Sequence, residues 1–121
     1  MTFADRIHNL RNDIPRCRLA AFGDVQTHLI LRASHEPGVR REFLDRLCHE
    51  AAACFDLTGV VEQDESGAEE AIVLTADDVR IYLRAPGNDT DFLCLVCDLE
   101  SDTQETIDIG HRALGSLAEV S

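Results

Sequence analysis

The segment FLCLVCDL at residues 92–99 constrains the fold more than any other part of the sequence. Successive side chains of a strand point to opposite faces, and here both alternating sets are apolar. Such a strand is buried on both sides, as the central strand of a covered sheet is. We therefore expect helices on both faces of one sheet.

Four other segments have the length and apolar content of strands, and they lie at residues 17–22, 28–33, 71–76 and 79–85. The last of these alternates cleanly, with Val79, Ile81 and Leu83 on one face. The links are short, and Pro86-Gly87-Asn88-Asp89 is a strong turn, so neighbouring strands are expected to be antiparallel. The acidic stretch at residues 62–70 is expected to be a loop.

Three segments show helical periodicity. The first follows a capping box at Thr2 and Asp5 and ends before Pro15. The second, at about residues 39–55, is apolar over more than half of its circumference, which is more than one sheet face needs. The third begins after Ser101 or Asp102, and its buried face is expected to consist of Ile107, Gly110, Leu114 and Leu117.

The predicted order is helix, two strands, helix, three strands, helix. This order predicts an α+β fold with three layers, α/β/α, around one five-stranded antiparallel sheet. At 121 residues the chain is expected to be a single domain over residues 1–121.

The charge is strongly negative and unevenly placed. Residues 1–57 hold eight arginines and eight acids, whereas residues 58–121 carry the whole net charge of −12. Phosphate binding needs a positive surface, so nucleic acid and anionic membranes are not expected partners. The acidic half either serves solubility or receives a basic partner.

No apolar run approaches the roughly 18–20 residues that span a bilayer, so membrane insertion is not expected. Residues 1–10 include Asp5 and Arg6 and lack the apolar core of an export signal. With five cysteines, an odd number, we expect free thiols and a cytoplasmic protein.

The sequence Cys94-Leu95-Val96-Cys97 is the one C-x-x-C motif. Redox and zinc sites need the two sulfur atoms to converge, but residues three apart on a strand point to opposite faces. We therefore interpret both as small core residues. Phosphate loops, catalytic triads and metal-ligand spacings are also missing from the sequence, so no enzyme activity, metal or cofactor is predicted.

Two features predict a homodimer. The strand at residues 71–76 is expected at a sheet edge and carries no charge or proline to guard it. Pairing with its own copy would cover this edge and bury the broad apolar stripe of the second helix. Arg40, Arg41 and Arg46 border that stripe, either as the rim of an interface or as a solvated helix face.

This pattern resembles the roadblock (dynein light chain) family. The resemblance is carried by Ile14-Pro15 before the first strand, by Ala20 to Thr27, by the second strand at Leu29 to Ser34, and by the closing meander and helix from Ala71. The chain departs from the pattern at Thr27, near a hairpin position where the family usually has glycine.

The resemblance implies a roadblock-like fold and a homodimer with a continuous ten-stranded sheet. It also implies a scaffold or regulator without an active site, whose protein partner is often a Ras-like small GTPase. By position, it marks six dimer-interface residues on the long helix and the edge strand: Phe43, Leu47, Ala51, Ile72, Val73 and Leu74.

Two other classes remain open. A small acidic dimer similar to the secretion chaperones, which bind effector proteins, would have three strands before the middle helix, whereas this sequence has room for two. An enzyme that uses its thiols is the third class, and the predicted divergence of Cys94 and Cys97 argues against it.

Overall fold

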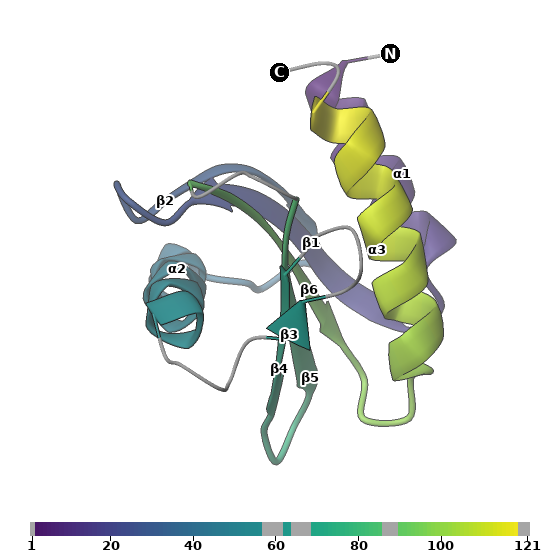
Figure 1. The fold of residues 1–121 in the computed structure, drawn as a ribbon. Helices are drawn as coiled ribbons and strands as arrows, with labels where there is room; N and C mark the ends of the chain where they lie inside the picture. The colour runs from purple at the N-terminus through teal and green to yellow at the C-terminus, as the bar shows by residue number, and fades with distance from the viewer. Residues whose placement is uncertain (1, 57–61, 64–68, 86–89, 119–121) are drawn as a thin grey trace.

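The computed structural model describes residues 2–56, 62–63, 69–85 and 90–118. These residues form one antiparallel sheet in the order β2-β1-β6-β5-β4-β3, with α1 and α3 on one face and α2 on the other (Figure 1). The elements are α1 (Phe3–Asp13), β1 (Cys17–Asp24), β2 (Leu29–His35), α2 (Arg41–Asp56), β3 (Glu62–Gln63), β4 (Glu69–Leu74), β5 (Val79–Arg84), β6 (Asp91–Cys97) and α3 (Thr103–Ala118).

The two faces of the sheet carry separate hydrophobic clusters, as the doubly apolar segment at residues 92–99 predicted. Leu93, Leu95 and Cys97 of β6 pack under α1 and α3, whereas Phe92 and Cys94 pack under α2. β6 lies between β1 and β5 and is buried from Phe92 to Cys97. The predicted α+β architecture with three layers is therefore confirmed.

The five predicted strands are present in the predicted order, but the loop expected at residues 62–70 is wrong at both ends. Glu62 and Gln63 form β3 and pair with Glu70 and Glu69, which begin β4. Long-range partners make strand structure favourable for these acids, because Arg84 donates to Glu69 at 2.6 Å and His111 pairs with Glu70 at 2.9 Å. Residues 64–68 of the expected loop lie outside the described residues.

The first helix begins as predicted. The backbone N–H of Asp5 donates to Thr2 Oγ1 and that of Thr2 donates to Asp5 Oδ2, both at 3.1 Å, which forms the capping box. The second helix begins at Arg41, two residues later than predicted. Ile107, Gly110, Leu114 and Leu117 of the third helix are buried, as expected.

The β1–β2 hairpin explains how the chain dispenses with the usual glycine near Thr27. Asp24 Oδ1 accepts the backbone N–H groups of Gln26 and Thr27, at 2.8 and 3.2 Å. The positive φ of 57° then falls on His28, one residue beyond Thr27. The register of β1 and β2 shifts between Phe22 and Gly23, which places a bulge in the ladder next to this turn.

Candidate protein-interaction surfaces

Helix α2 lies on the sheet with a narrow buried stripe. Leu47, Cys48, Ala51 and Cys54 are buried against Leu19, Ala21, Tyr82 and Cys94 of the sheet. Their spacing of three and four residues places all of them on the sheet-facing side of the helix. Two of the six residues predicted for the interface, Leu47 and Ala51, thus lie in the core of the single chain.

The outer and N-terminal parts of α2 are accessible. Arg40, Arg41 and Arg46 are exposed, and Phe43 is half-buried. A shallow hollow beside Phe43 is lined by Gly38, Val39, Arg40, Glu42, Phe43 and Arg46. This end of the helix combines exposed cations with an aromatic ring that a partner could reach.

Strand β4, which among the described residues pairs with β3 only at Glu69 and Glu70, presents a second surface. Leu74 is 72% exposed and lies opposite Val79 in the register, and Ile72 is 48% exposed and lies opposite Ile81. This register places them on the sheet face that carries α1 and α3. Val73 lies on the other face and packs against the cluster under α2. The structure therefore divides the six predicted interface residues between the two faces of the sheet.

Charged side chains tie α2 to the sheet. Arg80 of β5 donates to both carboxylate oxygens of Glu50 at 3.3 Å, and its Nε donates to Asp78 Oδ1 at 3.1 Å. The hydroxyl of Tyr82 donates to Glu50 Oε1 at 2.5 Å. The Arg80 guanidinium also lies 5.2 Å from the centre of the Phe43 ring. Sequence reasoning missed this network because its members are far apart along the chain.

A second arginine of β5, Arg84, also contacts both a carboxylate and an aromatic ring, here Glu69 of β4 and Phe55 of α2. Arg84 donates to Glu69 at 2.6 Å, and its guanidinium lies 4.2 Å from the centre of the Phe55 ring. Arg80 and Arg84 thus connect β5 with both ends of α2. Stacking on aromatic faces and pairing with carboxylates are favourable contacts for arginine, so these contacts hold the helix in register on the sheet.

The cysteines of the C-x-x-C motif diverge, as predicted. Cys94 and Cys97 are fully buried in the clusters on opposite faces of the sheet. Burial raises the pKa of Cys94 well above its usual value and raises the pKa of Cys48 to about 11. The thiols of Cys94 and Cys48 are therefore protonated near neutral pH and are poor nucleophiles.

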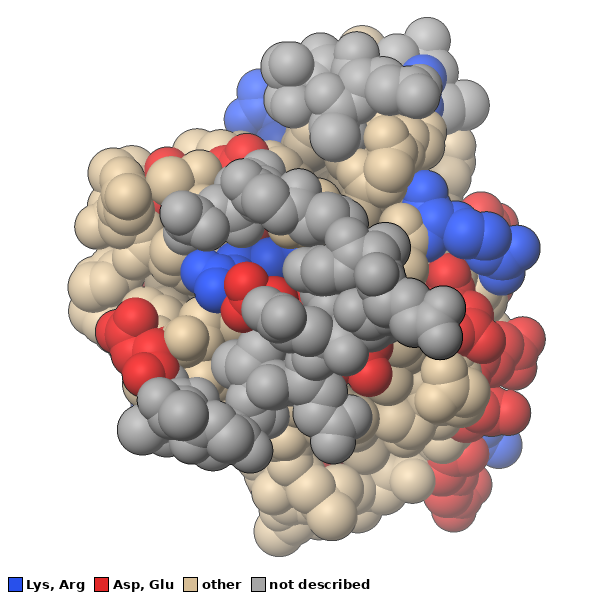
Figure 2. Space-filling model, in the orientation of Figure 1, with Lys and Arg blue, Asp and Glu red and all other residues tan. Residues whose placement is uncertain are grey.

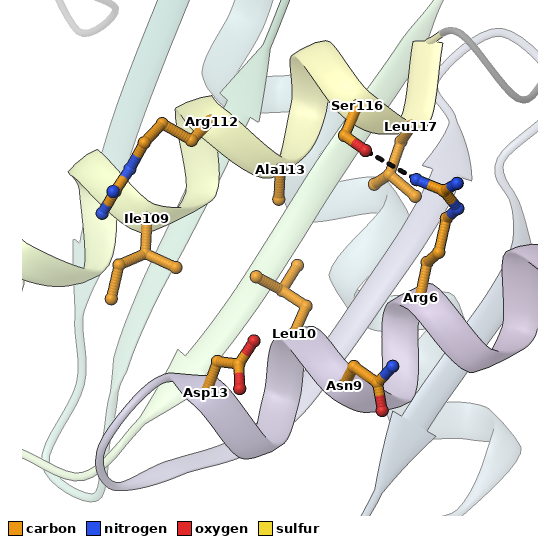
Figure 3. A pocket seen from close by; sticks show the side chains of 9 residues that line it. All are labelled: Arg6, Asn9, Leu10, Asp13, Ile109, Arg112, Ala113, Ser116 and Leu117. Carbon is orange, nitrogen blue, oxygen red and sulfur yellow. Dashed lines mark hydrogen bonds between the residues drawn. The ribbon is translucent and has the colours of Figure 1, made fainter. Parts of the chain in front are cut away.

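A groove between α1 and α3 is visible in Figure 3, where side chains from the two helices point toward one another. Leu10, Ile109, Ala113 and Leu117 supply apolar side chains, and Arg6 donates to Ser116 Oγ at 2.7 Å across the groove. Across the described ranges, no group of three histidine, cysteine or acidic side chains could hold a metal ion. None of the described helices is both long and apolar enough to cross a bilayer.

Solved structures of roadblock/LC7 domain proteins share this arrangement. The roadblock/LC7 domain from Streptomyces avermitilis superposes with a TM-score of 0.74 at 12% identity, over 98% of this chain and 97% of that one. MglB from Myxococcus xanthus gives 0.74 at 11% identity, over 98% and 93%. The gliding protein MglB from Thermus thermophilus gives 0.66 at 17% identity, over 99% and 91%.

No family model matches the sequence, and no curated protein matches it either. The likeness to roadblock domains therefore lies in the arrangement of helices and strands, at identities of 11–17% for the structures described above. The resemblance predicted from the sequence is confirmed at this level: the chain has the fold of roadblock/LC7 domains.

Proposed function

We propose that two copies of this chain associate into a cytoplasmic homodimer that serves as a non-enzymatic scaffold or regulator of another protein. The observation that carries the proposal is the apolar edge of β4, with Ile72 and Leu74 exposed. The shared fold supports it, because the roadblock resemblance implies dimers built on this strand and on α2.

The geometry of β4 favours a second copy of the chain as the partner that covers the outer edge of this strand. β3 pairs only with Glu69 and Glu70, and no other described strand pairs with the outer side of β4 from Ala71 to Leu74. An apolar strand edge without lysine or proline is prone to pair with another strand. Antiparallel pairing of two β4 strands about a two-fold axis joins two sheets and brings Ile72, Val73 and Leu74 to the contact.

Helix α2 has a supporting role in the proposed dimer. Phe43 and the arginine rim, Arg40, Arg41 and Arg46, are accessible to a second molecule. Leu47 and Ala51 face inward and hold the helix on the sheet. We accordingly propose Phe43 as the dimer contact of this helix, with the three exposed arginines at its rim accessible to a further protein partner.

The protein partner that we propose is a Ras-like small GTPase, which is the partner implied by the roadblock resemblance. An exposed arginine cluster suits a partner with carboxylates on its surface, because the guanidinium donates paired hydrogen bonds to them. The secretion-chaperone alternative gains no support, since only β1 and β2 precede α2 within the continuously described residues 2–56.

The dimer is tested by light scattering on the purified chain. We expect a mass of about twice the chain mass of 13.4 kDa for the wild type and 13.4 kDa for Leu74→Lys. Leu74 is 72% exposed, so the substitution should leave the folded chain intact, which circular dichroism checks. Leu31→Lys, on the opposite edge strand at 45% exposure, is the matched control and should remain dimeric. A wild type of 13.4 kDa at micromolar concentration would reject the dimer.

The partner is tested by retention on the immobilised chain. We expect a small GTPase to be retained from lysate, and then to bind in purified form with an affinity that depends on its nucleotide. The triple variant Arg40→Glu, Arg41→Glu, Arg46→Glu should lose this binding, whereas Arg32→Glu on β2 should keep it. Retention of a secreted effector in place of a GTPase would favour the chaperone class.

A further inference from the structure

Cys17 and Cys97 are brought together by the fold, although the sequence separates them widely. Cys17 begins β1 and Cys97 ends β6, and the two are direct partners in the antiparallel ladder. Both belong to the hydrophobic cluster under α1 and α3. Their side chains therefore emerge from adjacent strands on the same face of the sheet.

The hydrogen bonds around this pair show how close the two residues lie. The backbone N–H of Asp98 donates to the carbonyl oxygen of Arg16 at 3.1 Å, so the bond joins the residues that flank the pair. The N–H of Cys17 donates instead to Ile14 at 3.2 Å. On this side the two cysteines have the bonding of a non-hydrogen-bonded pair, in which facing residues of an antiparallel ladder lie closest. The register shifts on the other side, between Cys17 and Leu19, so the ladder is irregular there. Facing residues of antiparallel strands have Cα separations within the range of about 4.4–6.8 Å that a disulfide spans.

The thiols of Cys17 and Cys97 differ in burial and in pKa, as the attacking and resolving thiols of a reactive pair do. Cys17 is half-buried, whereas Cys97 is fully buried. A hydrogen bond from the Cys97 thiol lowers the pKa of Cys17, since it stabilises the thiolate against the opposing effect of burial. The same hydrogen bond, together with burial, raises the pKa of Cys97. Cys17 is thus the accessible nucleophile and Cys97 the protected second thiol.

The other three cysteines differ from Cys17 in their position in the fold and in the direction of their pKa shift. Cys48, Cys54 and Cys94 are buried in the cluster under α2, on the opposite face of the sheet. Burial raises the pKa of each of these thiols. Oxidation is therefore expected to select the pair on the α1 and α3 face.

We propose that Cys17 and Cys97 form a site of reversible disulfide formation that exchanges with low-molecular-weight disulfides. The Cys17 thiolate attacks one sulfur of the small disulfide, forms a mixed disulfide and releases one small thiol. Cys97 gives up its proton, attacks the Cys17 sulfur and expels the second small thiol. Two protein thiols are oxidised to one disulfide, and one small disulfide is reduced to two thiols.

The disulfide would join the chain segment that follows α1 to the segment that precedes α3, the two helices on one face of the sheet. Cys17 follows the turn after α1, and Cys97 precedes the turn into α3. Linking them closes a long loop, which restricts the unfolded chain and stabilises the folded one. This inference is independent of the proposed dimer, since β4 takes no part in the β1–β6 ladder.

The test uses the full chain in mixtures of glutathione disulfide and reduced glutathione, followed by alkylation and mass spectrometry. The reduced protein has five free thiols, and we expect two of them to become protected on oxidation. Peptide mapping should show Cys17 linked to Cys97. The oxidised protein should unfold at a higher temperature, and dithiothreitol should reverse this shift. In brief alkylation of the reduced chain, Cys17 should react first.

Two variants separate the pair from the other thiols. Cys17→Ser, at the half-buried position, should abolish both the protected thiols and the thermal shift. Cys54→Ala, on the other face, should retain both. The proposal fails if the oxidised wild type keeps all five thiols, if it stops at a glutathione adduct, if the linked peptide contains another cysteine pair, or if Cys17→Ser still loses two thiols.

Discussion

At the scale of single residues, Gly110 sets how closely α3 approaches the sheet. A Cβ atom at this position would lie 2.5 Å from Leu83 Cδ1 and 3.1 Å from Leu95 Cδ1. Both leucines are fully buried in the core, so a shift of either methyl group also displaces the close-packed side chains around it. The helix can lie this close to β5 and β6 because the residue has no side chain.

We predict that Gly110→Ala lowers the free energy of unfolding by about 1–3 kcal/mol, because overpacking outweighs the better helix propensity of alanine. Gly115→Ala is the matched control on the same helix, since a Cβ atom there meets nothing within 4 Å. It should raise the free energy of unfolding by about 0.5–1 kcal/mol. Urea denaturation measures both, and equal effects of the two substitutions would contradict the packing argument.

Asp5 makes the start of α1 sensitive to acid. The hydrogen bond from the backbone N–H of Thr2 lowers the pKa of the Asp5 carboxyl below its usual value of 3.8. A group with a lowered pKa stabilises the folded state above its unfolded pKa and loses this contribution as the pH falls through its folded pKa. The capping box should therefore weaken below about pH 4.

We predict that Asp5→Asn is less stable than the wild type at pH 6 and that this difference shrinks as the pH is lowered to 3. Urea denaturation of the two proteins across this range measures the difference directly. Comparing the two cancels the titration of the other acids. A stability difference between the two proteins that grows on acidification would contradict a lowered pKa for Asp5.

At the scale of elements, α2 is held by polar contacts as well as by its apolar stripe. The Tyr82 hydroxyl is buried and donates to Glu50, which also accepts from Arg80. A buried donor paired with a charged acceptor contributes more than a neutral hydrogen bond. This contact fixes the helix over β5 in a way that apolar packing alone does not.

We predict that Tyr82→Phe lowers the free energy of unfolding by about 1.5–3 kcal/mol, since it removes the hydrogen bond to Glu50 and changes little else in the core. Glu50→Gln and the double variant complete a thermodynamic cycle. A coupling energy near zero would show that the two side chains do not act together.

Individual elements show what sequence could and could not predict. The doubly apolar pattern of β6 and the strict alternation of β5 are local, so the three layers and the five main strands were predictable. β3 and the start of β4 were missed, because residues 62–70 have a loop-like composition, whereas Glu69 and Glu70 contact Arg84 and His111, which lie far along the chain, and β3 pairs with these two residues.

The same limit applies to the candidate surfaces. The apolar stripe of α2 was visible in the sequence, but periodicity did not separate Leu47, which is buried by the chain itself, from Phe43, which remains half-exposed. The pairing of Cys17 with Cys97 depends on the register of two strands at opposite ends of the chain. Register of this kind is set by the whole sheet, and local spacing carries no signal for it.

At the scale of the whole molecule, the net charge of −12 acts against the compact state. Figure 2 shows acidic side chains gathered along one side of the molecule, in the region where Figure 1 places α3. Glu100, Asp102, Glu105 and Asp108 are exposed in and just before this helix. Their mutual repulsion is felt most at low ionic strength.

We predict that sodium chloride raises the unfolding temperature by a few degrees between low salt and about 0.3 M, because it screens this repulsion. The effect should shrink near pH 5, close to the isoelectric point of about 4.6, where the net charge is small. Differential scanning calorimetry at both pH values measures it. An unfolding temperature that falls with salt at pH 7 would show that the ion pairs outweigh the repulsion.

If the proposed dimer forms, the β2 edge limits further growth of its sheet. In the proposed dimer the β4 strands are used, so a β2 strand stands at each end of the joined sheet, with Leu29 and Leu31 exposed. The bulge between Phe22 and Gly23 distorts the neighbouring ladder, and Arg32 adds an exposed charge to β2. A joined sheet that accepts strands at both ends grows into a fibre. Substitutions that regularise the bulge and neutralise Arg32 would therefore turn a finite pair into a seed for polymerisation.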